Sequence, residues 1–112
     1  MMIKRIIKLK KKLGFIESLN DMNEKLQSGN AAGALEKCNE LLRIDGRDDI
    51  LGDKDIYGFM FKIHYFQKDY QNAFYVLDQC KNQKMMNIAP VNLIQEVLHN
   101  VGRENQLSVY VK

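Results

Sequence analysis

The sequence contains one proline and only seven glycines among its 112 residues. So few turn-forming residues leave little room for a many-stranded sheet and favour helices. Long apolar runs are missing as well, since none approaches the ~20 residues that a helix needs to cross a bilayer. The basic start of the chain is followed by no uninterrupted apolar region and no small-residue cleavage site. We therefore expect no cleaved signal peptide.

Cysteine is scarce, and the patterns of catalytic sites are absent. Cys38 and Cys80 each lack a second cysteine nearby, whereas zinc sites and redox motifs use close pairs. We expect two buried, reduced thiols in a cytoplasmic protein. The sequence contains no glycine-rich phosphate loop, nucleophile elbow or paired metal-ligand motif, so we expect no enzyme, no cofactor and no metal. The aspartates of residues 44–53 do not have the spacing of a calcium loop; they are Asp45, Asp48, Asp49 and Asp53.

Charge is distributed unevenly along the chain. Six basic residues and no acidic one lie in the first twelve, although the net charge of the whole chain is only +3. The remaining hundred residues hold the other 11 basic residues and all 14 acidic ones. A basic segment on a mildly acidic body is not typical of a dedicated nucleic-acid binder, and none is expected as a partner.

Residues 1–13 form a predicted basic amphipathic helix. Isoleucines and leucines share one face, and most of the basic residues share the other. These basic residues are candidates for electrostatic contacts: Lys4, Arg5, Lys8, Lys11 and Lys12. The helix could adsorb to an anionic membrane surface, or attract acidic partners or nucleic acid. We favour a third interpretation, in which its apolar stripe packs on the next hairpin and the basic residues face solvent.

Residues 14–102 are predicted to form helical hairpins followed by a final helix. In hairpin one, Gly29 suits the left-handed end of a helix, and Asn30 suits the N-cap of the next helix, which extends to about Arg43. Hairpin two covers residues 54–83 and bends at Lys68-Asp69, with Asp69 as N-cap. Asp53 is predicted to cap its first helix, with Asp55 in the first turn. Pro90 fits the first turn of the final helix, which Gly102 ends. Residues 103–112 are a tail without an assigned structure.

The first helix of hairpin two is apolar on nearly every side, so we expect it to be covered on every side. Its apolar residues are Ile56, Tyr57, Phe59, Met60, Phe61, Ile63, Tyr65 and Phe66. We expect His64, on the same helix, to be packed and hydrogen-bonded, whereas His99 is expected to be exposed. The aromatic residues Tyr65, Phe66, Tyr70, Phe74 and Tyr75 could stack on nucleic-acid bases. A core with a partly exposed rim is the favoured interpretation.

An internal repeat links the two hairpins. Ala34 and Ala73 occupy equivalent positions 39 residues apart, and periods of this length indicate stacked helix pairs. We expect the small side chain where two antiparallel helices approach closely. The positions assigned to the repeat are Ala34, Cys38, Leu41, Tyr57, Met60, His64, Tyr70, Ala73, Leu77 and Cys80. Hairpin two follows the tetratricopeptide spacing, except that Phe61 stands at the motif's small residue and Met85 at its proline. The predicted fold is all-α, with antiparallel hairpins stacked as a short tetratricopeptide-like α-solenoid.

A family resemblance covers about half of the chain, from Asp55 to Gly102. Its residues are Asp55-Ile56-Tyr57-Gly58, His64-Tyr65, Tyr70, Ala73, Leu77, Asn87, Val97 and Gly102. This segment resembles the C-terminal region of the intraflagellar transport protein 140 family, a subunit of intraflagellar transport complex A. The resemblance implies a tetratricopeptide-like solenoid that acts as a scaffold in retrograde ciliary transport, with complex A subunits as partners. It implies no catalytic residues. Ile88-Ala89-Pro90 departs from the tyrosine pair of the family.

Two other functions remain open from the sequence alone. A stand-alone tetratricopeptide-like adaptor would hold a peptide or a partner helix between its hairpins. A membrane-associated or nucleic-acid-associated protein would act through residues 1–13, with strongly salt-dependent binding. The expected location is the cytoplasm, and the cilium if the resemblance holds.

Overall fold

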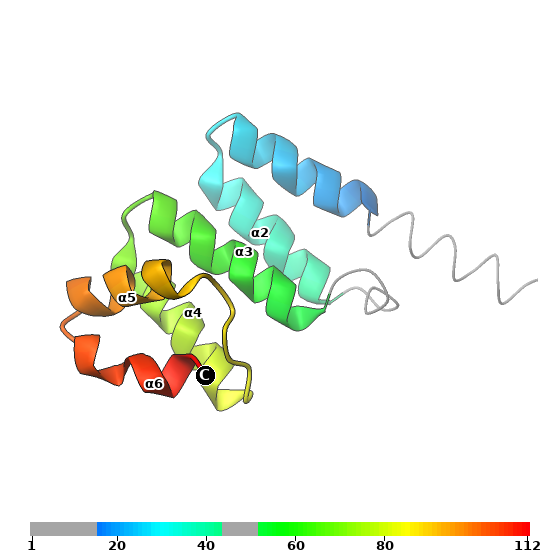
Figure 1. The fold of residues 1–112 in the computed structure, drawn as a ribbon. Helices are drawn as coiled ribbons and strands as arrows, with labels where there is room; N and C mark the ends of the chain where they lie inside the picture. The colour runs from blue at the N-terminus through cyan, green and yellow to red at the C-terminus, as the bar shows by residue number, and fades with distance from the viewer. Residues whose placement is uncertain (1–15, 44–51) are drawn as a thin grey trace, which may run out of the picture. The chain divides into compact units, whose positions relative to one another are not determined.

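The structure is a computed structural model that describes residues 16–43 and 52–112. Within these residues every regular element is helical (Figure 1), which confirms the predicted all-α fold. The chain divides into two compact units, residues 1–56 and 57–112, with the boundary inside α3. The elements are a helix over residues 16–27, α2 (Ala31–Leu42), α3 (Asp53–Phe66), α4 (Tyr70–Asn82), α5 (Val91–Asn100), the 3-10 helix η1 (Glu104–Gln106) and α6 (Leu107–Tyr110).

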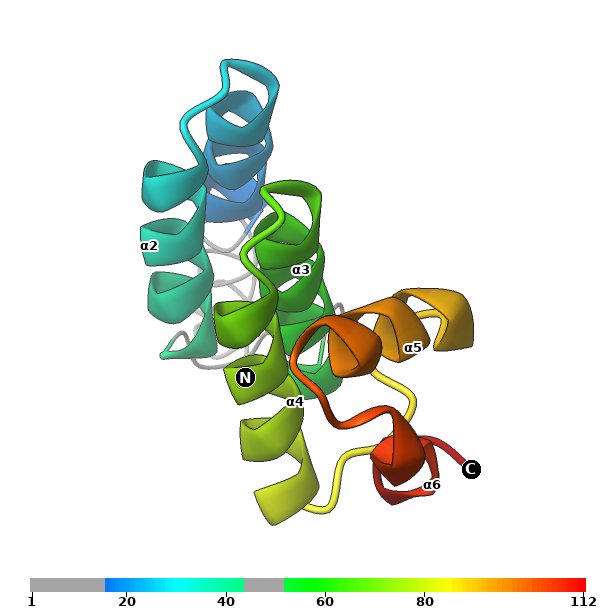
Figure 2. The ribbon, with the colours of Figure 1, turned by 90° about the vertical axis from the view of Figure 1, so that its left-hand side faces the viewer.

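The helix over residues 16–27 and α2 form the predicted hairpin one, and they lie side by side in Figures 1 and 2. The Sγ of Cys38 lies 3.3 Å from the Sδ of Met22 in the core between them. On the surface, Lys37 Nζ lies 3.2 Å from a carboxylate oxygen of Asp21. The hydrogen bond from Lys37 lowers the pKa of Asp21. The hairpin is therefore held by a buried sulfur contact and an exposed ion pair, of which the exposed pair contributes little.

The second helices of the two hairpins start in the same way. Asn30 Oδ1 accepts a hydrogen bond from the Gly33 amide at 3.0 Å, and Asp69 Oδ1 accepts one from the Asn72 amide at 3.4 Å. Each side chain satisfies an amide that the first turn of a helix leaves without a partner. Both predicted N-caps are confirmed, and they lie at the 39-residue offset of the repeat.

Four helices end in one backbone pattern. A residue with positive φ follows each helix, and the next amide donates to the carbonyl five residues earlier, as in a Schellman motif. The bonds are Asn30 to Lys25 (2.7 Å), Asp69 to His64 (2.9 Å), Met85 to Cys80 (2.8 Å) and Arg103 to Leu98 (2.8 Å). Gly29 and Gly102 hold two of the positive-φ positions, as predicted. Lys68 (φ +59°) and Lys84 (φ +61°) hold the other two, which the sequence did not indicate.

Substituting Lys68 with glycine is expected to stabilise the protein. A residue with a Cβ is disfavoured in the left-handed region by roughly 1–2 kcal/mol, and the greater chain entropy of unfolded glycine offsets part of the gain. We expect Lys68→Gly to raise the free energy of unfolding by about 0.5–1 kcal/mol, measured by urea denaturation. Lys68→Ala removes the same side chain but keeps the Cβ. Equal changes for the two variants would contradict this explanation.

In the second unit, α3 and α4 form the predicted hairpin two. Gln83 Nε2, just after α4, donates to the Tyr57 hydroxyl near the start of α3 at 3.2 Å, so the two helices are antiparallel. The buried side of α4 consists of Ala73, Phe74, Val76, Leu77 and Cys80. α5 packs against α4 through a buried stripe of Ile94, Val97 and Leu98. Apolar residues recur at helical spacing in both stripes. Val91, the first residue of α5, is exposed.

Residues 103–112 contain two helical elements that the sequence did not reveal. η1 and α6 follow α5 directly, and α6 packs against both α4 and α5. Tyr110 of α6 is buried, with 4% of its surface exposed. The segment is therefore part of the packed second unit. The division of the chain into residues 1–13, 14–102 and 103–112 remains a prediction.

Two predicted helix starts differ from the structure by one residue. α3 begins at Asp53 itself, and it is the Asp55 carboxylate that accepts the Gly52 amide at 3.1 Å. Pro90 is the N-cap of α5, where its ψ of 140° is non-helical, and the first helical residue is Val91. Asp53 and Pro90 both remain at helix starts. An acidic side chain is favourable there, and the amide that proline lacks would have no partner within the helix.

Candidate protein interface

The repeat positions assigned from the sequence fall into two groups. Seven of them are buried. Six of these, on α2 and α4, form the first group: Ala34, Cys38, Leu41, Ala73, Leu77 and Cys80. The second group consists of the buried Met60 and the half-buried Tyr57 and His64 on α3, with the half-buried Tyr70 at the start of α4. The first group lies on the buried faces of α2 and α4, where Ala34 and Ala73 have no exposed surface. The complete burial of these two alanines fits the predicted close approach of two helices at this position. The assignment of the ten positions to an internal repeat remains a proposal.

Neither cysteine offers a reactive thiolate. Cys38 and Cys80 are both buried and free, as predicted. Burial raises the pKa of each thiol to about 11. Because the thiolate is the nucleophile and the metal ligand, both groups are inert near neutral pH. Within residues 16–43 and 52–112, no three histidine, cysteine or acidic side chains are placed to hold a metal ion. Asp45, Asp48 and Asp49 lie outside those ranges.

His64 is packed as predicted, but its Nδ1 does not make the predicted hydrogen bond. This atom is buried without a hydrogen-bond partner among the described residues. The nearest acidic oxygen, Asp69 Oδ2, is 3.8 Å away, which is too long for a hydrogen bond. Burial lowers the pKa of His64 from its ordinary value of 6.5, and the charge of Asp69 partly opposes the shift.

The lowered pKa of His64 predicts a loss of stability in mild acid. The folded state favours neutral imidazole, so this contribution is complete above pH 6.5 and declines as the pH falls through the folded pKa. We expect the free energy of unfolding, measured in urea at about pH 7.5 and about pH 5, to fall less in His64→Gln than in the wild type. His99→Gln is the control, because His99 is exposed and pairs with Glu104. If the free energy of unfolding of His64→Gln fell with pH as much as that of the wild type, the assignment of this pH dependence to His64 would be contradicted.

Aromatic side chains gather where α3 turns into α4. Tyr65 makes edge-to-face contacts with Phe66 at 5.3 Å and with Tyr70 at 6.3 Å between ring centroids. We call these three residues the aromatic cluster. Phe66 is 75% exposed, so the prediction that α3 is covered on every side is wrong at this residue. Phe66 is the last residue of α3, where a neighbouring helix covers less of the surface.

Tyr65 also connects the aromatic cluster to α5. Its hydroxyl donates a hydrogen bond to Glu96, which raises the pKa of Tyr65 because the neutral phenol is the donor. The two residues are 31 positions apart, and the sequence carried no signal for this contact. Since the bond holds the Tyr65 ring in one orientation, the ring of Phe66 beside it has a fixed support. Preorganised aromatic side chains are typical of protein interfaces.

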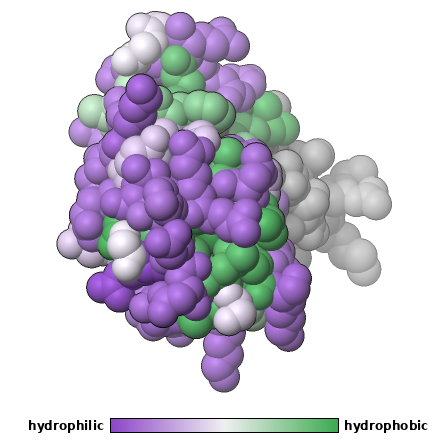
Figure 3. Space-filling model, turned by 60° about the vertical axis from the view of Figure 1, so that its left-hand side comes forward, coloured by the Kyte–Doolittle hydropathy of each residue, from purple (hydrophilic) through white to green (hydrophobic). Residues whose placement is uncertain are grey.

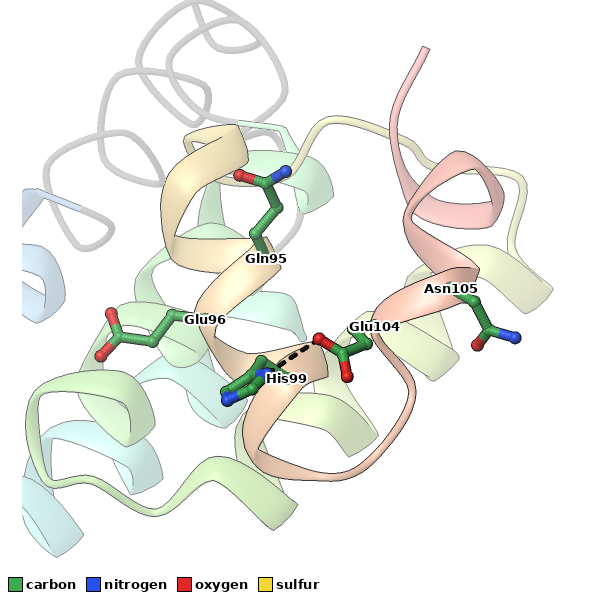
Figure 4. A pocket seen from close by; sticks show the side chains of 5 residues that line it. All are labelled: Gln95, Glu96, His99, Glu104 and Asn105. Atoms are coloured by element: carbon green, nitrogen blue, oxygen red, sulfur yellow. Dashed lines mark hydrogen bonds and ion pairs between the residues drawn. The ribbon is translucent and has the colours of Figure 1, made fainter.

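Beyond Glu96 lies an open cavity of about 480 Å³. Its lining residues are Gln95, Glu96 and His99 on α5 and Glu104 and Asn105 on η1 (Figure 4). His99 Nδ1 lies 2.9 Å from Glu104 Oε2, and both side chains are exposed, as predicted for His99. The cavity thus brings together two carboxylates, two amides and one imidazole at the surface of α5 and η1.

Exposed apolar side chains occur in both units. On the face drawn in Figure 3, hydrophobic side chains reach the surface in limited areas among mostly hydrophilic ones. The large exposed hydrophobic residues are Ile16, Leu26, Phe66, Tyr75, Val91 and Val109. Phe66 is the most exposed of them, and it belongs to the aromatic cluster. The five candidate electrostatic residues of the N-terminal segment lie outside the described residues. Among the described residues, no helix is long and apolar enough to cross a membrane.

Comparison with known proteins identifies a family. The family model for the C-terminal tetratricopeptide repeat domain of intraflagellar transport protein 140 matches residues 2–81. The match covers residues 2–13 of the basic N-terminal segment, hairpin one, and hairpin two as far as residue 81. It includes the resemblance residues from Asp55 to Leu77, whereas Asn87, Val97 and Gly102 lie beyond it. No curated protein and no solved structure matches the chain.

Tetratricopeptide repeat domains are non-catalytic folds that bind proteins, and such hairpins pack mainly on their neighbours in the array. The family match extends over more than two thirds of the chain, and the described part consists of helical hairpins with matching turns. The chain is thus a tetratricopeptide-type protein-interaction module, and it belongs to the family of C-terminal domains of intraflagellar transport protein 140.

Proposed function

We propose that the chain is a non-enzymatic scaffold that binds subunits of intraflagellar transport complex A in retrograde ciliary transport. The observation that carries this proposal is the family match over residues 2–81. Its location would then be the cytoplasm and the cilium.

Phe66 is the best candidate for the centre of the interface. It is mostly exposed, and it contacts the Tyr65 ring, whose hydroxyl bonds Glu96 at the edge of the cavity. An exposed aromatic residue at the centre with polar groups around it is the usual composition of a binding hot spot. A complex A subunit would cover Phe66 with apolar side chains and leave the cavity as the polar rim.

The test is affinity purification of the tagged full chain from ciliated cells, with quantitative mass spectrometry of the recovered proteins. We expect complex A subunits with the wild type, and at least tenfold less of them with Phe66→Ala. Tyr75→Ala is the matched control, because Tyr75 is an exposed aromatic residue of α4 outside the aromatic cluster. Equal recovery by the wild type and Phe66→Ala would remove Phe66 from the interface. Failure of the wild type to recover complex A would refute the proposed function.

The basic N-terminal segment requires a separate variant. The family match begins at residue 2, which favours its packing within the repeat array over a role as a membrane or nucleic-acid anchor. We therefore expect the quintuple glutamine variant of Lys4, Arg5, Lys8, Lys11 and Lys12 to recover the same subunits as the wild type. Loss of recovery in that variant, together with binding to anionic vesicles or nucleic acid by the wild type alone, would support the membrane or nucleic-acid function instead.

A further inference from the structure

Residues 103–112 cover one aromatic side chain of α4 from two directions. The guanidinium carbon of Arg103 lies 4.9 Å from the centroid of the Phe74 ring, over its face. Tyr110 meets the same ring edge-to-face, with centroids 6.2 Å apart and planes at 76°. Both geometries are the attractive ones for a ring whose face is negative and whose edge is positive. Phe74 is buried in this arrangement.

A single connector residue fastens the end of the segment. The Asn87 amide donates to the Tyr110 carbonyl at 3.0 Å, and the Lys112 amide donates to the Asn87 side-chain oxygen at 3.0 Å. Asn87 has a φ of +57°, a left-handed conformation that asparagine tolerates better than most residues. The beginning of the segment is fastened by the Arg103 amide to Leu98 and by Glu104 to His99.

Between these two attachments, one side chain provides most of the burial of the segment. Tyr110 is the one fully buried side chain of residues 103–112, and it interacts with Asp78 of α4. Leu107 and Val111 are half-buried, and Ser108 and Val109 of the short α6 are exposed. Segments with few buried apolar contacts open locally at a much lower free energy than the whole domain. Opening of residues 103–112 would expose Phe74 while the turns and caps of α3 and α4 remain in place.

We propose that residues 103–112 are a displaceable strap over a docking site centred on Phe74 of α4. The partner that replaces the strap is a peptide segment of another protein that carries one basic and one aromatic side chain, in the roles of Arg103 and Tyr110. The strap lies beyond the residues matched by the family model. This site is separate from the aromatic cluster, so either site can fail without the other.

The first experiment is hydrogen exchange on the full wild-type chain, read residue by residue by NMR. The Asn87 amide donates to a carbonyl of the strap, and the Val111 amide donates to a carbonyl within the strap. After correction for intrinsic rates, we expect both amides to exchange at least tenfold faster than the Leu77 amide of α4. Exchange of all three at one rate would mean that the strap opens only when the protein unfolds. That result would overturn the proposal without any variant.

The second experiment supplies the strap as a separate molecule. A fluorescent peptide with the sequence of residues 103–112 is titrated into the full-length Tyr110→Ala variant, whose folding is checked by circular dichroism. We expect binding at least tenfold tighter than to the wild type, in which the attached strap competes. A peptide with alanine at the position of Tyr110 should not bind. Val109→Ala is the matched control, because Val109 is an exposed residue of α6, and this variant should bind the peptide as weakly as the wild type does.

No binding of the peptide to a folded Tyr110→Ala variant would overturn the proposal, since the vacated site should accept the same side chains. Equal binding to the wild type and to Tyr110→Ala would overturn it as well, since the peptide would then occupy another surface.

Discussion

Replacing Gly58 with alanine is expected to destabilise the protein by about 1–3 kcal/mol, the usual cost of overpacking a tight contact. An alanine Cβ at this position would lie 2.6 Å from the carbonyl oxygen of Ile88. The oxygen belongs to the backbone of the connector between α4 and α5, so it cannot move aside as the end of a side chain would. The new methyl group must therefore push the connector away from α3.

The sign of this effect is informative, because it opposes the local preference. Gly58 lies inside α3, and in an exposed helix alanine is favoured over glycine by roughly 0.5–1 kcal/mol. The close approach of the connector must outweigh this preference. Equilibrium unfolding in urea provides the measurement, with Gly52→Ala as the control. There the nearest atom to the new Cβ is Asp55 Oδ2 at 4.0 Å, an ordinary van der Waals distance. A Gly58→Ala variant as stable as the wild type would contradict the observed packing.

Replacing Phe61 with alanine is expected to cost about 3–5 kcal/mol, the range for removing a buried aromatic side chain. Phe61 has no exposed surface, and in residues 16–43 and 52–112 it is the largest of the fully buried side chains. Its ring stacks at 6.4 Å on Tyr65, which supports the aromatic cluster. The loss combines the removed apolar surface with the cavity left behind. It should also weaken the support of the cluster.

Phe66→Ala is the matched control for Phe61→Ala, since both residues lie on α3 and differ in exposure. Phe66 is mostly exposed, so its truncation should change the free energy of unfolding by less than about 0.5 kcal/mol. Thermal and urea denaturation of the two variants should differ by several kcal/mol. Similar losses in both variants would contradict the assignment of Phe61 to the core and Phe66 to the surface.

Local signals in the sequence predicted the helices and most of their ends. Asn30, Asp69, Gly29 and Gly102 act through hydrogen bonds and backbone angles within a few residues of themselves, so their residue types alone indicate their roles. The buried stripes of α2, α4 and α5 follow from helical spacing. The family resemblance rests on particular residues between Asp55 and Gly102 rather than on helical spacing, and the family model matches residues 2–81.

Contacts between residues far apart in sequence were not predictable. Tyr110 becomes buried only because Phe74 and Asn87 receive it, and no local pattern of residues 103–112 announces that contact. Tyr65 and Glu96 are a further example at 31 residues of separation. Likewise, Lys68 adopts a left-handed conformation because the turn between α3 and α4 requires it. A composition rule would have expected glycine at this position.

The exposure of Phe66 shows the limit of the pattern argument for α3. Apolar residues on every side of a helix predict cover on every side. The middle of α3 follows that rule, with Met60, Phe61 and Ile63 buried, but its last residue does not. In a protein-interaction module, an aromatic residue that the module leaves exposed is a candidate contact for a partner. The mismatch between pattern and structure therefore leads directly to the proposed interface.

Direct binding of the purified full chain to purified intraflagellar transport complex A tests the central claim of this account most directly. The measurement is isothermal titration calorimetry at about 0.15 M salt, because this ionic strength weakens any binding that depends only on exposed surface charges. We predict saturable binding by the wild type and by Tyr75→Ala, with at least tenfold weaker binding by Phe66→Ala. Absence of binding by the folded wild-type chain would contradict the account.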